Sequence, residues 1–294
     1  MTQSITAHGD SALGHDRHED EQRGHEPRGH GHDGHGADPR GTATDTAASH
    51  AHAHALAFDS VASQYAAARP GYPAALYDAV EELTGRPLKG SRVVDVGAGT
   101  GIATRALHDR GARVVAVEPG HAMACELRRA LPGVPLLRAV GDALPLADGT
   151  ADLVTYAQAW QWTDPARSVP EAFRVLARPH GALALWWNVP DPDTSWTRAQ
   201  EARLAGRLPG YHAHSVTTEA ARIIRGLDPG LAPVRRRLHW TRRVSFDTHL
   251  ANLGSRSYFA AMGPEAAAPV LADERDDSWS CSPTGSSKRR TRWI

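Results

Sequence analysis

The stretch "VVDVGAGTGIATRAL", residues 93–107, runs from apolar residues directly into three glycines and then into a helix-like pattern. The glycines are Gly97, Gly99 and Gly101, in the spacing G-x-G-x-G. The dinucleotide fingerprint G-x-G-x-x-G would need a glycine at Ile102, and the phosphate loop G-x-x-x-x-G-K-[ST] would need a lysine after the glycines. The stretch therefore predicts a strand-to-helix turn that approaches a nucleotide-like ligand other than a pyrophosphate.

Strand-like and helix-like segments alternate on both sides of this turn. Strands are expected at residues 92–99, 112–120, 134–143, 151–160 and 182–189, with helices at 74–85, 100–111, 121–133 and 170–181 between or before them. A further helix is expected at 195–208 and a late strand at 235–246. Such alternation is typical of βαβ units, so we predict an α/β fold: a doubly wound, mostly parallel sheet with helices on both faces.

Charge and cysteine content exclude several classes of protein. Lys plus Arg and Asp plus Glu are equal at 33 each, so no overall field favours a nucleic acid. The two cysteines, Cys125 and Cys281, allow no disulfide framework and do not have metal-ligand spacing. We see neither the apolar core of a signal peptide nor a stretch long enough to span a membrane. The sequence predicts a soluble, cytoplasmic protein.

Composition divides the chain into three parts. Residues 1–55 contain ten of the 17 histidines and almost nothing large and apolar, so we predict a disordered His-rich arm. Residues 56–277 carry the α/β pattern. Residues 278–294 are predicted to be an irregular basic tail.

The His-rich arm has two interpretations. Imidazoles near carboxylates, as in "GHGHDGHG" at 29–36, suit Ni or Zn. No fixed ligand spacing repeats, however, so we favour a tail with incidental affinity for such metals and assign no metal site. Because the arm has nothing apolar to pack, deleting residues 1–50 is expected to leave ligand affinity and thermal stability nearly unchanged.

Each of the first three predicted strands carries an acidic side chain in its carboxyl-terminal part or near it. Asp95 lies in the first strand, Glu118 ends the second and Asp142 ends the third. In a parallel sheet the ligand binds at the carboxyl ends of the strands. Three carboxylates there would repel a pyrophosphate, but they suit a positively charged ligand that carries a ribose diol.

Four segments resemble the successive motifs of the class I S-adenosylmethionine (SAM)-dependent methyltransferases, whose fold is Rossmann-like. They are "VVDVGAGTG", "VVAVEPG", "GDALPLADGTADLV" and "EAFRVLARPHGALALWW". "FDSVASQYAAARPGYP" and "AWQW" narrow the resemblance to small-molecule members similar to the ubiquinone/menaquinone and trans-aconitate methyltransferases. The resemblance covers about residues 56–270 and implies SAM as cofactor and a small-molecule methyl acceptor, with no nucleic acid or membrane partner.

The resemblance also implies a role for individual residues. The backbone of Gly97, Ala98, Gly99 and Gly101 would approach the methionine part of SAM, and Asp95 would organise that loop and the ammonium group. Glu118, followed by Pro119, would accept hydrogen bonds from the ribose hydroxyls. Asp142, beside Ala143, would read the adenine amino group. The remaining expected cofactor contacts are Gln158, at the methyl end, and the lid residues Tyr65 and Arg69.

Two tryptophans flank Gln161 after the fourth strand. We expect Trp160 and Trp162 to lie near the acceptor pocket, with one of them in the core and the other in the pocket wall. Many relatives carry His where this chain has Gln161, and a Gln side chain cannot act as a general base. We therefore assign no catalytic residue. The expected reaction is in-line methyl transfer that depends on alignment and desolvation.

Two alternatives to a methyltransferase are considered. An NAD-dependent oxidoreductase would share the glycine turn and Glu118, but Ile102, Asp142 and the lack of a downstream Tyr-x-x-x-Lys pair disfavour it. A non-catalytic protein that binds SAM, or metal through its His-rich arm, is the second alternative. The sequence identifies neither the acceptor nor the atom that is methylated.

The end of the chain departs from the resembled family. Relatives close their sheet with a final antiparallel strand, whereas "SWSCSPTGSSKRRTRWI", residues 278–294, has no alternating apolar pattern. We therefore expect that strand to be missing and the edge of the strand at 182–189 to be unpaired, on a less stable body that is prone to associate. A native basic interaction tail and a truncated or frame-shifted end remain as explanations of this segment.

Overall fold

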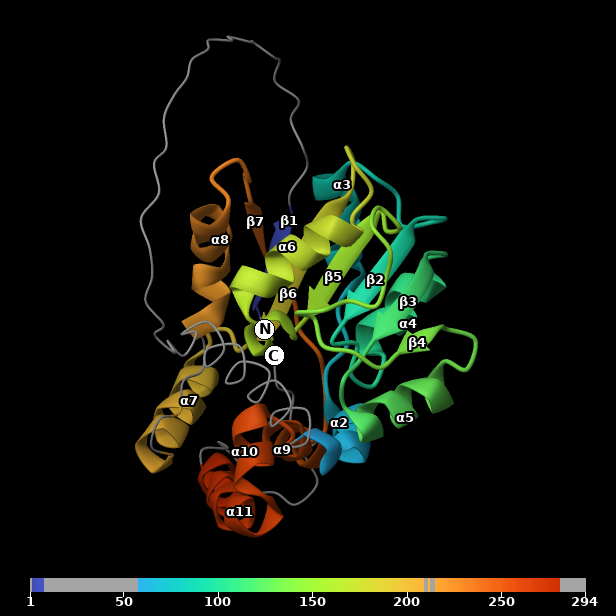
Figure 1. The fold of residues 1–294 in the computed structure, drawn as a ribbon. Helices are drawn as coiled ribbons and strands as arrows, with labels where there is room; N and C mark the ends of the chain where they lie inside the picture. Colours follow the sequence, from blue (N-terminus) through green and yellow to red (C-terminus); the bar gives the residue numbers. More distant parts are fainter. Residues whose placement is uncertain (1, 8–57, 209–210, 212–214, 281–294) are drawn as a thin grey trace, which may run out of the picture.

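The computed structural model describes residues 2–7, 58–208, 211 and 215–280. Its centre is a seven-stranded sheet in the order β4-β3-β2-β5-β6-β1-β7 (Figure 1). The strands are β1 (Thr2–Ala7), β2 (Arg92–Val96), β3 (Arg113–Val117), β4 (Leu136–Leu137), β5 (Leu153–Ala157), β6 (Ala182–Val189) and β7 (Val234–His239). Strands β2 to β6 pair in parallel, and β1 is antiparallel to both of its neighbours. The predicted doubly wound, mostly parallel sheet is confirmed.

The helices are α2 (Ala62–Ala68), α3 (Ala74–Thr84), α4 (Ile102–Asp109), α5 (His121–Ala130), α6 (Pro165–Val175), α7 (Ser195–Arg207), α8 (Ser215–Leu227), α9 (Phe246–Gly254), α10 (Ser257–Met262) and α11 (Pro264–Ser280), with a 3₁₀ turn at Trp160–Trp162. The expected helix at 195–208 corresponds to α7. The expected strand at 235–246 corresponds to β7 only as far as His239 and is wrong beyond it, because residues 240–245 are not in a strand and α9 begins at Phe246. The third predicted strand, 134–143, is reduced to the two residues of β4.

The alternation of side chains along β6 shows how the sheet is covered. Trp186 packs with α3 and α4 in one buried cluster, whereas Leu183, Leu185 and Trp187 pack with α6 and α8 in the other. Successive side chains of a strand point to opposite faces, so a run of consecutive apolar residues fills both layers. Figure 1 shows α9, α10 and α11 together with α2 at one end of the sheet.

Residues 2–7 are a correction to the sequence analysis. They form β1, whose Thr2 pairs with Val189 of β6 and with His239 of β7. The predicted disordered arm is therefore wrong for these six residues, and the expected unpaired edge of β6 is wrong as well. Thr2, Ile5 and Thr6 favour a strand, but these residues directly precede the low-complexity segment that starts at His8, and the composition of residues 1–55 as a whole hides their preference. The rest of the arm, 8–57, lies outside the described residues.

The C-terminal part is described as far as Ser280. Helix α11 continues three residues beyond the predicted domain end at 277. The remainder of the predicted tail, with its basic run "KRRTR", lies outside the described residues.

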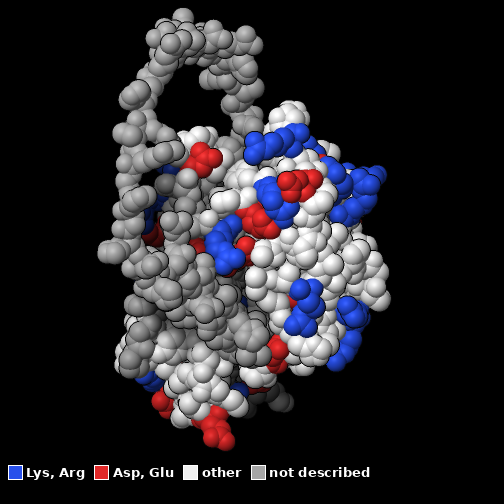
Figure 2. Space-filling view, in the orientation of Figure 1, with Lys and Arg blue, Asp and Glu red and all other residues white. Residues whose placement is uncertain are grey.

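Surface charge is mixed on the face drawn in Figure 2. Lys and Arg side chains form small groups separated by uncharged surface, and several have acidic neighbours. Among the described residues, none of the helices is long and apolar enough to cross a membrane.

Candidate active site

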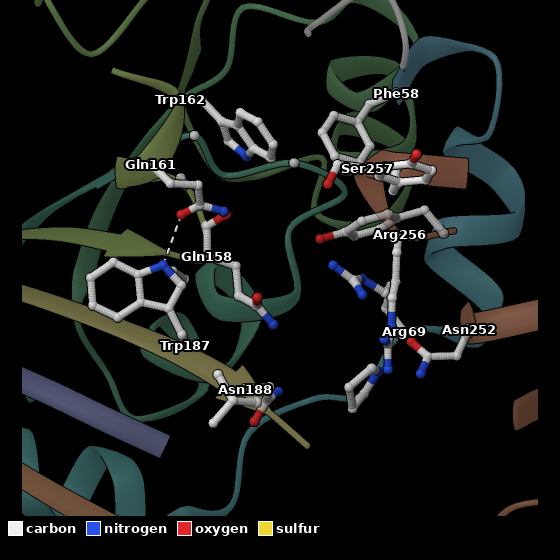
Figure 3. A pocket seen from close by; sticks show the side chains of 18 of the residues that line it. Phe58, Arg69, Gln158, Gln161, Trp162, Trp187, Asn188, Asn252, Arg256 and Ser257 are labelled. Atoms are coloured by element: carbon white, nitrogen blue, oxygen red, sulfur yellow. Dashed lines mark hydrogen bonds between the residues drawn. The ribbon is translucent and has the colours of Figure 1, made fainter. Parts of the chain in front are cut away.

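A cavity of about 690 Å³ lies at the carboxyl ends of the parallel strands. Its wall combines residues after β2, β3, β5 and β6 with residues of α2, α7, α9 and α10. In Figure 3, Gln158 and Asn188 lie across this cavity from Arg69 and Arg256. The predicted site residues that line it are Tyr65, Arg69, Gly97, Gly99, Glu118, Pro119, Asp142, Gln158 and Trp162.

The turn after β2 brings bare backbone to the cavity. Gly97 has φ +66°, and a Cβ on it would lie 2.4 Å from Ala159 Cβ. Gly99 has φ +57°, and no heavy atom would lie within 4 Å of a Cβ placed there. Glycine is the residue that adopts this conformation without strain. Gly97 therefore allows close packing of the chain, and Gly99 leaves room for a ligand.

The third glycine of the motif has a different task. Gly101 caps α4 with φ +87°, and an added Cβ would lie 3.0 Å from Leu127. Gly101 does not line the cavity, and neither does Ala98, which is 8 % exposed and packs in the core. Direct cofactor contacts were predicted for both residues. In this structure both residues shape the turn from behind, and their cofactor contacts stay a prediction.

Asp95 is also behind the turn. Its buried carboxyl group accepts hydrogen bonds from the hydroxyls of Thr104, at 2.6 Å, and Thr155, at 2.9 Å. Burial raises its pKa to about 6. Since Asp95 does not line the cavity, the predicted role of organising the loop fits its position, whereas contact with the ligand ammonium does not.

Glu118 follows β3 and connects two turns. Its Oε2 accepts the Gly99 N–H at 2.8 Å, and its Oε1 accepts the Gly120 N–H at 2.7 Å. Burial raises its pKa to about 7, although these two hydrogen bonds act in the opposite direction. The carboxylate is thus fixed at the cavity wall, with lone pairs still free to accept hydrogen bonds from a ligand.

Asp142 lines the cavity and also binds the backbone just before α6. Its Oδ1 accepts the Asp164 N–H at 3.0 Å, just before α6, and burial raises its pKa. The alternative that Asp142 caps a neighbouring segment is therefore compatible with a ligand contact. Ala143 does not line the cavity, and its cofactor contact stays a prediction.

The loop after β5 is strained at Gln158. With φ +59°, Gln158 is the non-glycine residue of the described chain with a left-handed backbone. Its carbonyl accepts the Gln161 Nε2–H at 2.8 Å, and Gln161 Oε1 accepts the Trp187 Nε1–H at 2.7 Å (Figure 3). Strained backbone of this kind is found at functional sites, where surrounding contacts hold it. The Gln161 side chain therefore holds the Gln158 backbone in place against Trp187. The sequence analysis considered only whether residue 161 could act as a base and did not predict this structural role.

The two tryptophans of this loop separate as expected. Trp160 is 1 % exposed, and its Nε1–H donates to Ser168 Oγ at 3.2 Å, so it belongs to the core rather than to the acceptor pocket. Trp162 lines the cavity, with its ring 6.0 Å from that of Phe58. The ring of Phe58 in turn lies 5.9 Å from Tyr65 of α2.

The segment around α2 is tied to both ends of the cavity. Asp59 Oδ1 accepts the Ala122 N–H at 2.8 Å, at the start of α5. Gln64 Nε2 donates to the Ala251 carbonyl of α9 at 2.9 Å. A carboxylate suits the amino end of a helix, so Asp59 is a recognisable partner for α5 once the two segments are known to meet. Sequence reasoning had missed it because the residues are 63 positions apart.

Side chains of α7, α9 and α10 build the far end of the cavity, and none of them was predicted. Burial, with Arg256 and Arg242 nearby, lowers the pKa of His249 to about 4. Gln200 Nε2 donates to Glu274 at 3.2 Å, so the Gln200 oxygen faces His249 Nε2 at 3.1 Å as an acceptor. His249 is therefore neutral near pH 7, with its proton on Nε2.

The comparisons with known proteins agree with this arrangement. The methyltransferase domain family matches residues 94–185. An uncharacterized methyltransferase of Mycobacterium tuberculosis is 37 % identical over 203 residues, which are 69 % of this chain and 77 % of that protein. The chain belongs to the class I SAM-dependent methyltransferases. The identification rests on a relative that shares most of its length, not on the glycine motif alone.

Two more distant relatives are recorded. A malonyl-[acyl-carrier protein] O-methyltransferase of Geobacter sulfurreducens is 44 % identical over 93 residues, 30 % of this chain and 35 % of that protein. A SAM-dependent methyltransferase structure from Mesorhizobium loti is 30 % identical, covers 35 % of this chain and 50 % of that one, and has a TM-score of 0.32.

The cofactor of this methyltransferase is SAM, and the cavity residues fit it. The space at Gly99 admits a ligand against the backbone, and the fixed Glu118 carboxylate is an acceptor for hydroxyl groups. No cluster of three or more His, Cys, Asp or Glu side chains that could hold a metal ion occurs within the described ranges. The Ni or Zn affinity expected of the His-rich arm falls outside them.

Proposed function

We propose that this methyltransferase transfers the methyl group of SAM to a small-molecule acceptor bound between α7, α9 and α10. One observation carries the proposal: a single cavity contains Gly99 and Glu118 at one end and Asn252 and Arg256 at the other. A cofactor placed on the glycine turn would thus share one cavity with a second molecule.

The cofactor end is proposed to bind SAM through fixed groups. Glu118 would accept the ribose hydroxyls, Asp142 the adenine amino group, and Gly97 and Gly99 would lie against the methionine part. Pro119 would cover the ribose side, and Gln158 would lie at the methyl end. This assignment is supported by the position of each residue on the cavity wall.

The chemistry asks little of the protein beyond alignment. Bound SAM supplies a methyl group on a sulfonium, which is already a good leaving group. The rings of Phe58, Tyr65 and Trp162 pack against one another in the cavity wall and would help to exclude water. The strained Gln158 loop would fix the geometry for in-line transfer. His249 has too low a pKa to be an effective base near pH 7, so the proposal contains no general base.

Calorimetry tests the cofactor end directly. Glu118→Ala is expected to weaken SAM binding by about 2–3 kcal/mol, because charge-assisted hydrogen bonds of that order are lost. Asp109→Ala removes an exposed carboxylate outside the cavity wall and serves as the control. NAD, titrated in parallel, is expected not to bind. Equal SAM affinity in Glu118→Ala and the parent would refute the assignment.

Labelled SAM tests the transfer itself. The protein is incubated with methyl-labelled SAM and a metabolite extract, and the labelled product is isolated. We expect label in a low-molecular-weight compound and none with Glu118→Ala at limiting SAM. Label only in protein or nucleic acid would contradict a small-molecule acceptor.

A further inference from the structure

Two guanidinium groups in the cavity wall lack acidic partners. Arg69 directly follows α2, and Arg242 lies in the segment between β7 and α9. Arg69 Cζ lies 4.7 Å from the centre of the Tyr65 ring. Arg242 Nη2 donates to the Ala68 carbonyl at 3.3 Å. Uncharged groups of α2 and its C-terminal end thus hold both side chains in place.

The acids of the wall are engaged elsewhere. Within the described residues, neither Arg69 nor Arg242 forms an ion pair with a carboxylate. Glu118 is bound to the Gly99 and Gly120 amides, and Asp191 accepts the Asp193 N–H at 3.0 Å. The positive charge of the two arginines is therefore not offset by the protein around them.

The third arginine of the wall shows the contrast. Arg256 Nη1 lies 2.9 Å from Glu201 Oε1 and donates to the Tyr211 hydroxyl at 2.6 Å. Its charge is compensated within the fold. Arg256 therefore has a structural role. Arg69 and Arg242, in contrast, have N–H donors and a positive charge that could interact with a ligand.

The environment of Arg242 adds an energetic reason. Its Nε–H is buried without a hydrogen-bond partner among the described residues. Burial and the charge of Arg69 both lower the pKa of Arg242. Burying an unpaired donor beside a like charge is unfavourable, and a bound anion would remove both costs.

We propose that Arg69 and Arg242 bind a carboxylate group of the methyl acceptor, so that Arg69 serves the acceptor and not the cofactor contact expected from the sequence. The guanidinium fork matches the two oxygens of a carboxylate. Trp240, Val244 and Tyr258 also line the cavity, so the acid is expected to have an apolar or aromatic body. This inference rests on the proposed function, because it names the acceptor class for the same cavity.

The test uses the full-length protein saturated with S-adenosylhomocysteine. Phenylacetate, octanoate and benzoate are titrated by calorimetry at constant ionic strength, each beside its uncharged amide, with phenyl phosphate as a second anion. We expect at least one carboxylate to bind at least about tenfold more tightly than its amide, as expected for a charge-assisted contact. Arg69→Gln and Arg242→Gln are each expected to weaken that carboxylate about tenfold or more.

Arg243→Gln is the matched control, since Arg243 is the exposed neighbour of Arg242 and does not line the cavity. It should change the carboxylate affinity less than about twofold, because a surface charge acts weakly through solvent. Equal binding of acid and amide, loss of affinity in Arg243→Gln to the same extent, or tighter binding of phenyl phosphate than of every carboxylate would overturn the proposal. Failure of all three carboxylates to bind would overturn it too.

S-adenosylhomocysteine separates this result from the proposed function. If S-adenosylhomocysteine binds and the carboxylates do not, the acceptor class is wrong and the cofactor assignment stands. If S-adenosylhomocysteine does not bind, the proposed function itself fails, whatever the carboxylates do.

Discussion

The two ends of the cavity are built in different ways. At the proposed cofactor end, the groups that line the cavity are the backbone of the Gly97–Gly99 turn and carboxylates such as that of Glu118, which directly follows β3. At the acceptor end they are long side chains carried by α7, α9 and the segment before α9, such as Gln200, His249 and Arg242. The sheet topology fixes the first set. The second depends on how helices pack, which leaves it free to vary without changing the fold.

Removing β1 should cause the largest loss of unfolding free energy, and the loss should affect only the proposed acceptor end of the cavity. Strand β1 pairs with β6 up to Val189, next to cavity residues Trp187 and Asn188. Deleting residues 1–7 removes the ladder hydrogen bonds of six residue pairs on each edge of β1. At about 1 kcal/mol for each bond, the loss of unfolding free energy should exceed about 5 kcal/mol. Denaturant unfolding measures it.

This outcome would reverse the expectation that truncating the N-terminal arm changes nothing. SAM affinity of the folded protein should stay within about twofold, because the glycine turn is on the other side of β5. An unchanged unfolding midpoint would show that β1 does not stabilise the sheet, and a large loss of SAM affinity would show that the two ends of the cavity are not independent.

Gly97→Ala should come next, at the cofactor end. A Cβ would meet Ala159 Cβ at 2.4 Å on a residue with φ +66°. The left-handed conformation and the overpacking together cost about 3 kcal/mol of stability, with loss of SAM binding. Gly99→Ala is the matched control: φ is similar but the space is open, so its stability loss should be only about 1 kcal/mol. Equal losses would show that the close packing at Gly97 is not rigid.

The two ends should respond to pH with opposite sign. The pKa of Glu118 is raised to about 7, so its ionisation destabilises the fold increasingly as the pH rises from 4.5 to 7. The pKa of His249 is lowered to about 4, so protonation of the unfolded chain lowers stability as the pH falls from 6.5 to 4. Each contribution reaches about 3 kcal/mol, and they oppose each other over the shared range.

Single variants separate the two contributions. Relative to the parent, Glu118→Gln should gain stability as the pH rises from 4.5 to 7, and His249→Gln should gain it as the pH falls from 6.5 to 4. Urea unfolding at half-unit pH intervals gives both curves. Curves of the same sign would contradict the contrast between the two ends.

The smallest effect concerns SAM affinity. If the ionised Glu118 accepts the ribose hydroxyls, protonation must compete with binding below its pKa of about 7. The apparent Kd for SAM should rise about tenfold from pH 8 to pH 6, which is about 1.4 kcal/mol. Calorimetry at both pH values tests this, and in Glu118→Gln the affinity should be weaker but independent of pH. A pH-independent parent would mean that Glu118 does not contact the ligand in ionised form.

Sequence patterns predicted the parallel strands well because their signal is local. Residues 92–96 and 182–189 are mostly apolar, with Val93, Val94 and Val96 in the first and six consecutive apolar residues, 182–187, in the second, as expected of strands buried on both faces. The strand predicted at 134–143 is too long, because only Leu136–Leu137 pairs with β3, at the edge of the sheet. β1 was missed because its partners are far away in the chain and its own six residues are mostly polar.

The site follows the same division. Gly97, Gly99 and Glu118 could be found because a strand end and a turn place them, whatever the rest of the chain does. Arg242 and His249 could not, because nothing local distinguishes them from the many Arg and His residues elsewhere. Their significance lies in burial and in the groups packed around them, which only the folded structure shows.

The position of β1 also has a consequence for biosynthesis. Strand β1 lies before the other described strands in the chain but is paired with residues 184–189 and 234–239, so neither of its edges can be satisfied until those later residues have been synthesised. The covalent connection to the rest of the sheet passes through residues 8–57. A single proteolytic cut there would leave β1 attached only by non-covalent contacts, which are its hydrogen-bond ladders and its packing against α3 and α8. Such a nicked protein is a two-fragment complex, and a synthetic peptide of residues 1–7 should exchange with its own N-terminus in solution.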